Sequence, residues 1–256
     1  MWQLEASGRV IGPVAAVLID KDGTLAHSAP YLETLAAARV AACLQAVAAP
    51  QRPALRGGLK AAFGLANDGL DPMGSLAVAG RRDNLISAAT CLAQAGLSWH
   101  VALDAAEAAF ARAETDGTGQ RQACLSAPVA GARAWLEQAR SQELPCAVLS
   151  ADTTAPIEAF LTRWGLRQLI HAVRGADQLP AKPEAGAVHS LAGSLGVSSG
   201  DCVVIGDSAH DIAMGRAAGV RAVIGFTGGW ARPPTLPQAD LLIAAWQELA
   251  INPWQG

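Results

Sequence analysis

The sequence has little net charge and no basic segment. Its 19 Lys and Arg residues and 22 Asp and Glu residues give a formal net charge of −3 at pH 7. No run of lysines and arginines interrupts this balance, so the surface has no positive field that would bind a polyanion. We therefore expect a protein without a nucleic-acid partner.

Cysteines are few and scattered. The five of them, Cys43, Cys91, Cys124, Cys146 and Cys202, include no Cys-x-x-Cys pair. An odd number at wide spacing indicates neither a disulfide framework nor a zinc site. We interpret them as small buried residues in a reducing compartment.

The sequence also has little that resembles a membrane or export segment. The opening stretch MWQLEASGRVIG contains a glutamate and no apolar core of signal type. No stretch of about 18 uninterrupted apolar residues occurs. We expect a cytoplasmic protein without a membrane partner.

What the chain does have is enough apolar sequence for a substantial core. Of its 256 residues, 51% are hydrophobic and 16% are charged. This excludes a disordered or fibrous protein and allows one large domain or two modest ones.

From residue 127 onward, short apolar runs alternate with longer alanine-rich segments. The runs of strand type are 145–150, 169–175, 201–208, 221–226 and 239–246, and residues 14–19 match them in composition. The segments between them have apolar positions three and four apart, at 131–142, 154–165, 184–196 and 208–219. The alternation predicts βαβ units and an α/β fold with a Rossmann-like, mostly parallel sheet.

Residues 30–115 differ from this pattern, because they are helix-like and have few β-branched runs. The helical segments are 34–49, 54–66, 81–96 and 102–114, with turns at 51–53 and 67–74. Glycine, serine and proline at 27–31 and 115–120 indicate hinges. We expect a core of residues 1–26 and 120–256, with an all-helical domain of residues 27–119 inserted after the first core strand.

Polar side chains follow the ends of the predicted strands. In an open parallel sheet, ligands bind at the carboxyl ends of the strands, where loops and helix N-termini converge. The residues at these ends, or in the adjoining loop, are Asp20, Asp22, Ser150, Lys182, Asp207 and Asp211. We therefore expect four carboxylates, one hydroxyl and one ammonium at one edge of the sheet.

This set of groups suits a phosphate ester and a metal ion. Carboxylates that lie close together repel unless a cation lies between them, and oxygen ligands favour Mg²⁺. The metal and Lys182 would neutralise phosphate charge, while Ser150 and the amides behind it would donate hydrogen bonds to phosphoryl oxygens.

The first strand ends in two acids on either side of a lysine. Because side chains alternate along an extended chain, we expect Asp20 and Asp22 to face one way and Lys21 to face away from them. Gly23 allows a sharp turn directly afterwards, so the two acids need not be equivalent.

The ordered motifs DKDGTL, a strand ending in Ser150, AKPE around Lys182 and VIGDSAHD resemble the four motifs of the haloacid dehalogenase superfamily of phosphatases. The resemblance covers residues 14–25 and 127–224, and residues 125–136 loosely resemble phosphoglycolate phosphatase-like members. The helical insertion resembles that family's cap domain of the first type. The family commonly has an apolar residue where this chain has Lys21.

The resemblance implies a role for each matching residue. Asp20 would be the nucleophile that forms an aspartyl phosphate, and Asp22 the general acid and base. Mg²⁺ would be bound by Asp20, Asp207 and the main-chain carbonyl of Asp22, and Asp211 would support the metal's waters or orient Lys182. The remaining phosphoryl contacts would come from Thr24, which also fixes the turn, and from Ser150, Ala151 and Lys182.

Several of these residues also have a plain structural interpretation. Asp-x-Asp-Gly-Thr is an ordinary turn sequence, Asp211 could cap a helix, and Lys182 could be a solvated loop lysine. His210 is best interpreted as a surface histidine. His27, just beyond the first motif, is a candidate for the interface with the insertion, and its contact with substrate stays open. In the insertion, Arg81 and Arg82 either begin a solvated helix or contact an anionic substrate group.

The function predicted from these motifs is a Mg²⁺-dependent phosphatase that hydrolyses a small phosphorylated metabolite through an aspartyl phosphate, with the insertion closing over the site. A phosphomutase with the same chemistry is one alternative, and a non-catalytic module that binds phosphorylated ligands is another. Asp22 argues against a dehalogenase, and an acid pair on the first strand argues against a receiver domain. The substrate and the oligomeric state stay open.

Overall fold

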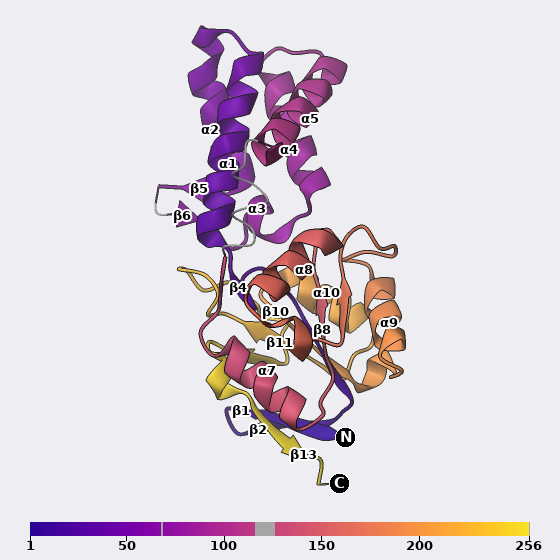
Figure 1. Ribbon diagram of the computed structural model, residues 1–256. Helices are drawn as coiled ribbons and strands as arrows, with labels where there is room; N and C mark the ends of the chain where they lie inside the picture. The colour runs from indigo at the N-terminus through magenta and orange to yellow at the C-terminus, as the bar shows by residue number, and fades with distance from the viewer. Residues whose placement is uncertain (68, 116–125, 256) are drawn as a thin grey trace. The chain divides into compact units, whose positions relative to one another are not determined.

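The structure, a computed structural model, describes residues 1–67, 69–115 and 126–255. Contacts within the chain divide it into two compact units, one of Met1–Ser28 with Ala127–Gly256 and one of Ala29–Ser126 (Figure 1). The first break lies inside the hinge expected at residues 27–31. Of the hinge expected at 115–120, only Thr115 is described, and the expected core boundary at residue 120 lies outside the described residues.

The first unit is built on a six-stranded parallel sheet (Figure 1). In spatial order its strands are β12 (Leu241–Ile243), β11 (Ala222–Phe226), β10 (Cys202–Gly206), β3 (Ala16–Ile19), β8 (Cys146–Leu149) and β9 (Ala172–Arg174). Each strand coincides with an apolar run of the sequence, so the α/β fold with a mostly parallel sheet is confirmed.

Both faces of this sheet are buried, which explains why its strands are continuously apolar. Val17 and Ile19 of β3 belong to one core cluster, together with side chains of α7 (Ala132–Ser141) and α8 (Thr154–Arg163). Ala16 and Leu18 belong to the other, with side chains of α9 (Ala185–Ser194) and α10 (Ala209–Ala217). Helices on both faces therefore fix where the strands end.

A second, antiparallel sheet was not predicted. It joins β13 (Ala250–Pro253), β1 (Trp2–Ala6) and β2 (Arg9–Val14), with the turn at Ser7 and Gly8 in the left-handed region. Val14 therefore ends β2, and the central strand β3 begins at Ala16. Short elements complete the unit: β4 (Ala26–His27) pairs with β7 (Ala127–Pro128), and single turns lie at η3 (Arg167–Leu169), η4 (Ser199–Asp201) and η5 (Trp246–Glu248).

The second unit is helical, as expected. Its helices are α1 (Ala29–Cys43), η1 (Leu44–Ala46), η2 (Ala49–Gln51), α2 (Arg52–Phe63), α3 (Ser75–Val78), α4 (Arg81–Gln94) and α5 (Trp99–Thr115). A hairpin of two-residue strands, β5 (Leu65–Ala66) and β6 (Gly69–Leu70), interrupts them. Residues 51–53 were expected to form a turn, but α2 begins at Arg52, because a proline in the first helical turn needs no N–H partner.

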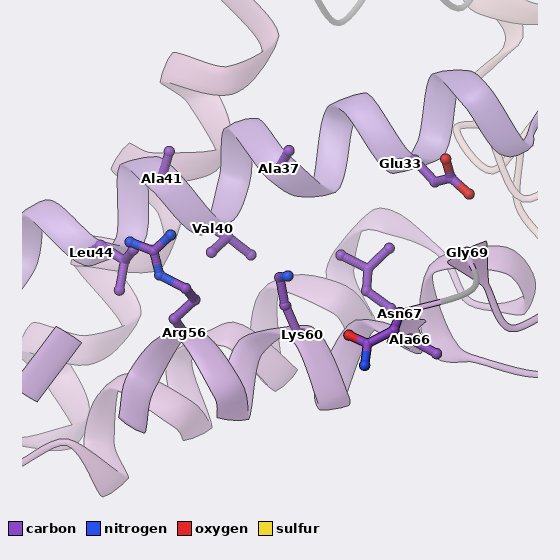
Figure 2. A pocket seen from close by; sticks show the side chains of 11 residues that line it. Glu33, Ala37, Val40, Ala41, Leu44, Arg56, Lys60, Ala66, Asn67 and Gly69 are labelled. Atoms are coloured by element: carbon purple, nitrogen blue, oxygen red, sulfur yellow. The ribbon is translucent and has the colours of Figure 1, made fainter. Parts of the chain in front are cut away.

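The helical unit has a surface groove of about 470 Å³ between α1, α2 and the hairpin (Figure 2). Arg56 and Lys60 of α2 lie opposite Val40 of α1 and Leu44 of η1. None of the predicted site residues lines this groove. The chemistry predicted from the motifs therefore has to be sought at the sheet of the first unit.

Two further expectations concern cysteines and membrane segments. The cysteines that the structure describes, Cys43, Cys91, Cys146 and Cys202, are free thiols, and Cys124 lies outside the described residues. Within the described ranges, no helix has both the length and the apolar character needed to cross a bilayer.

Trp246 is expected to be a main contributor to the stability of the first unit. Its ring is fully buried, with ring centroids 5.0 Å from Trp135 and 5.4 Å from Phe226, and its indole N–H donates to the carbonyl of Thr24. Trp246→Ala should lower the free energy of unfolding by about 3–5 kcal/mol, measured by denaturant titration. Trp99→Ala, at a half-exposed position of α5, should change it by about 0.5 kcal/mol or less. Equal effects of the two substitutions would contradict this assignment.

Candidate active site

The first acid follows directly from the central strand. The amide of Asp20 donates to the carbonyl of Ile205 on the neighbouring strand β10 at 2.9 Å, which continues the ladder one residue beyond β3. The chain then turns, because the amides of Leu25 and Ala26 donate back to the carbonyl of Lys21. Asp20 is thereby fixed at the carboxyl end of the sheet with its carboxylate buried.

Gly23 is required at the centre of that turn. Its φ of 75° lies in the left-handed region, and a Cβ there would collide with the Trp230 indole and the Asp207 carboxylate. The turn therefore packs closely against the end of β10 and the segment after β11.

The second pair of acids comes from β10 and α10. Asp207 follows Gly206, the last residue of β10, and Asp211 lies in the first turn of α10. Ser208 and Asp211 form a capping box, in which the Ser208 hydroxyl accepts from the Asp211 amide and the Ser208 amide donates to the Asp211 carboxylate. A Cβ at Gly206 would collide with Asp211. Asp211 thus caps its helix with one oxygen and presents the other to the site.

Lys182 joins two of these acids. Its ammonium lies 2.6 Å from Oδ1 of Asp20 and 2.6 Å from Oδ1 of Asp211. The side chain is buried, although Lys182 belongs to the loop between β9 and α9. The solvated-lysine interpretation is therefore wrong, and the alternative of Asp211 as a cap alone is incomplete.

Asp207 accepts hydrogen bonds on both of its oxygens. The Trp230 indole N–H donates to Oδ2 at 2.5 Å, and the Thr24 hydroxyl donates to Oδ1 at 3.1 Å. Sequence reasoning missed Trp230, because it lies outside the four motifs, which end before residue 225. The available signal was the segment TGGW directly after β11, where a polar N–H follows the carboxyl end of a strand.

Three buried carboxylates crowd together at this edge of the sheet. Asp20, Asp207 and Asp211 each offer an oxygen within 4.8 Å of the others. Burial raises the pKa of Asp20 to about 7 despite the opposing effect of Lys182. Burial, and then the charges of Asp20 and Asp211, raise the pKa of Asp207 well above its ordinary value. The cluster is short of positive charge and offers only oxygen donors, so it fits a hard divalent cation.

The predicted geometry of Lys21 is wrong. Its ammonium lies 2.6 Å from Oδ1 of Asp22 and 3.0 Å from Oδ2 of Asp152, rather than on the opposite side from the acids. The expectation assumed that strand alternation continues through residue 22. Strand β3 ends at Ile19, and the turn that follows brings the Lys21 and Asp22 side chains together.

The carboxylate of Asp22 is not one of the three clustered carboxylates. The metal contact expected of Asp22 involves its main-chain carbonyl, and that contact stays a prediction.

The loop after β8 contains the predicted phosphoryl contacts. Ser150 is buried, its amide donates to the carbonyl of Arg174, and its hydroxyl accepts from the amide of Asp152 at 3.1 Å. Ala151 is half-buried beside it. Among the described residues, Ser150 makes no hydrogen bond to the three carboxylates, so its role and that of Ala151 stay predictions.

The remaining predicted residues lie elsewhere. In the helical unit, Arg81 donates to Glu114 with its Nε at 2.7 Å, whereas Arg82 is exposed. Contacts of Arg81 and Arg82 with substrate stay predictions. His27 has Nδ1 3.0 Å from the Gly229 carbonyl and is exposed. His210 is exposed, as expected for a surface histidine.

The chain resembles known proteins over most of its length. A sequence model of the haloacid dehalogenase-like hydrolases matches residues 14–219. A phosphoglycolate phosphatase of Rhodospirillum rubrum is 30% identical over 234 residues, which cover 89% of this chain and 86% of that protein. A plasmid-encoded phosphoglycolate phosphatase of Cupriavidus necator is 30% identical over 240 residues, which cover 93% and 92% of the two chains.

Solved structures share the fold. The crystal structure of a predicted phosphoglycolate phosphatase from Haemophilus somnus 129PT superposes with a TM-score of 0.65 at 20% identity, covering 91% of this chain and 95% of that one. A haloacid dehalogenase superfamily hydrolase of Geobacter sulfurreducens gives a TM-score of 0.56 at 17% identity, covering 92% and 97%.

Removing one clustered charge should stabilise the metal-free protein. In Asp207→Asn, the amide oxygen can accept from Trp230 and the amide N–H₂ can donate to the Thr24 hydroxyl, while the repulsion with Asp20 and Asp211 is lost. The melting temperature in EDTA should rise by roughly 2–4 °C, the shift that 1 kcal/mol produces in a chain of this size. Asp201→Asn, at a partly exposed position of η4, is the matched control; it weakens only an ion pair with Arg221 and should not raise the melting temperature.

The rise in melting temperature produced by Asp207→Asn should depend on pH. A buried carboxyl with a raised pKa costs stability progressively as pH rises from its ordinary value to its raised value. The difference between Asp207→Asn and wild type in EDTA should therefore be larger at pH 8, above the Asp20 pKa of about 7, than at pH 5. A variant that is destabilised at both pH values would contradict the charge-crowding interpretation.

Proposed function

This chain belongs to the haloacid dehalogenase-like hydrolases, among the phosphoglycolate phosphatase-like members, and we propose that it hydrolyses the phosphate ester of a small metabolite with the help of Mg²⁺. The observation that carries the proposal is the convergence of Asp20, Asp207 and Asp211 with Lys182 at the carboxyl ends of β3 and β10.

The oxygen-rich cluster supports a metal site. We propose that Asp20, Asp207 and the main-chain carbonyl of Asp22 bind Mg²⁺, with Asp211 supporting it from the first turn of α10. When bound, the ion would neutralise carboxylate and phosphate charge and polarise the phosphoryl group. The Trp230 and Thr24 hydrogen bonds orient Asp207 for this task.

Asp20 is proposed to be the nucleophile. Lys182 contacts its Oδ1, and this ammonium favours the ionised carboxylate against the effect of burial. In the first step a carboxylate oxygen of Asp20 forms a bond to phosphorus while the bond from phosphorus to the ester oxygen breaks. The protonated Asp22 gives its proton to the leaving oxygen, which departs as an alcohol.

The second step regenerates both acids. Asp22, now ionised, takes a proton from a water molecule whose oxygen attacks phosphorus, and the bond from phosphorus to Asp20 breaks to release inorganic phosphate. Lys182, the Ser150 hydroxyl and the Ala151 amide are proposed to bind the phosphoryl oxygens during transfer. The helical unit, as a cap, would exclude bulk water.

Phosphoglycolate is the first candidate substrate. Two relatives that match this chain over most of their length carry the name phosphoglycolate phosphatase. A panel of phosphorylated metabolites assayed with and without Mg²⁺ would rank phosphoglycolate against larger sugar phosphates. Release of free phosphate supports a phosphatase, and an isomerised sugar phosphate would support a mutase.

The proposed nucleophile gives the sharpest test. Asp20→Asn preserves side-chain shape and removes the attacking oxyanion, so kcat for p-nitrophenyl phosphate and for phosphoglycolate should fall by at least about 10³-fold. Thermal unfolding of the variant checks that the fold is retained, and Asp201→Asn should keep wild-type turnover. Continued Mg²⁺-dependent turnover by Asp20→Asn would falsify the proposed mechanism.

A further inference from the structure

Lys21 is a buried cation between two acids. Only 2% of its side chain is exposed, and its ammonium contacts both Asp22 and Asp152. We propose that Lys21 is a positioning residue that binds one carboxylate oxygen of Asp22 and thereby directs the other oxygen to proton transfer. The inference rests on the proposed function, in which Asp22 is the general acid and base.

The hydrogen bonds of Asp22 distinguish its two oxygens. The Lys21 ammonium and the Ser28 hydroxyl both donate to Oδ1. Among the described residues, none donates to Oδ2, and the side chain remains 20% exposed. A carboxylate bound at one oxygen by two donors has little rotational freedom, so Oδ2 is the oxygen left to exchange a proton with the leaving group.

Lys21 is itself fixed at both ends. Its main-chain carbonyl accepts from the amides of Leu25 and Ala26 in the turn, and its ammonium lies 3.0 Å from Asp152. The amide of Asp152 donates to the hydroxyl of Ser150. Lys21 therefore connects the acid that follows β3 with the loop that follows β8, where the phosphoryl contacts are proposed.

Stability alone does not explain a lysine at this position. The chain has three lysines, and the side chains of two of them, Lys21 and Lys182, are buried against aspartates of the site. Burying an ammonium carries a large desolvation penalty, and apolar residues of similar volume are often as stable or more so. A methionine would fill the same space beside the Phe160 ring, 6.0 Å from the ammonium, without that penalty. The charge is therefore better explained by what it does to Asp22.

The two classes of substrate need Asp22 to different extents. An alkyl ester leaves as an alkoxide unless Oδ2 protonates the leaving oxygen as the bond to phosphorus breaks. p-Nitrophenolate is a stable anion and leaves without a proton. The second step, in which Asp22 is the base, is common to both substrates, so the two are compared by kcat/KM, which reports the steps up to formation of the aspartyl phosphate. Loss of Asp22 positioning should therefore lower kcat/KM more for alkyl phosphates than for p-nitrophenyl phosphate, whereas general damage to the site should lower it for both alike.

Lys21→Met tests this difference at saturating Mg²⁺. For phosphoglycolate, or for the best alkyl phosphate of the panel, kcat/KM should fall by about 10- to 100-fold. For p-nitrophenyl phosphate, whose leaving group needs no proton, kcat/KM should fall by less than about 3-fold. Asp22→Asn defines the largest loss to expect, and Lys60→Met, at an exposed position of α2, is the matched control that should keep the wild-type ratio.

Two further variants keep the test decisive if Lys21→Met does not fold. Asp152→Asn removes the second partner of Lys21 without altering Asp22, and should give the same substrate pattern with a smaller loss. Where Lys21→Met does fold, its losses and those of Asp152→Asn should be less than additive in the double variant, because both act through one contact. Ser28→Ala removes the other donor to Oδ1 and should also slow the alkyl phosphate selectively.

The outcomes separate this inference from the proposed function. Equal losses for both substrates, or no loss, in Lys21→Met and Ser28→Ala would overturn the positioning role. If Asp20→Asn is inactive in the same assays, the phosphatase mechanism stands while the role of Lys21 fails. If Asp20→Asn is active, the proposed function fails, whatever the Lys21 variants show.

Discussion

The repulsion between buried carboxylates is the constraint on which the site depends. Asp20, Asp207 and Asp211 have oxygens within 4.8 Å of one another, and burial removes the water that would screen them. The surrounding residues either relieve this crowding or make it sterically possible. Lys182 contacts two of the acids, Trp230 and Thr24 donate to the third, and glycines at positions 23 and 206 leave the space that the carboxylates occupy. Three carboxylates with one ammonium leave excess negative charge, which a divalent cation would neutralise.

Each acid of the first motif, Asp20 and Asp22, contacts a different lysine. Lys182 reaches Asp20 from a loop more than half the chain away, whereas Lys21 reaches Asp22 from the adjacent position. The two cations act in different surroundings, since Asp20 lies in the buried cluster and Asp22 stays partly exposed. In the proposed mechanism, this difference corresponds to attack by Asp20 and proton exchange by Asp22. An acid pair that looks symmetrical in sequence becomes unequal because the turn after β3 sends the two side chains to different partners.

Local sequence predicts most of this fold and fails where distant segments meet. Continuous apolar runs mark the six parallel strands because both sheet faces are buried, and polar residues directly after them mark the edge where ligands bind. The pairing of β1 with β13 escaped prediction because it joins the two ends of the chain, whereas the β1–β2 hairpin is local and was not identified. Trp230 escaped because only folding brings its N–H to Asp207. Lys21 was misplaced because strand alternation was extended three residues past Ile19, where β3 has already ended.

The central strand of the sheet holds the crowded carboxylates in place. The four residues of β3 are buried on both faces and pair with β10 on one side and β8 on the other. A shift of Asp20 would therefore break ladder hydrogen bonds and expose apolar surface on both faces. Lys21 fixes the chain beyond the strand as well, because its main-chain carbonyl closes the turn and its ammonium contacts Asp152 in the loop after β8. The position of Asp22 thus depends on two neighbouring strand ends, which argues that its geometry is set before substrate arrives.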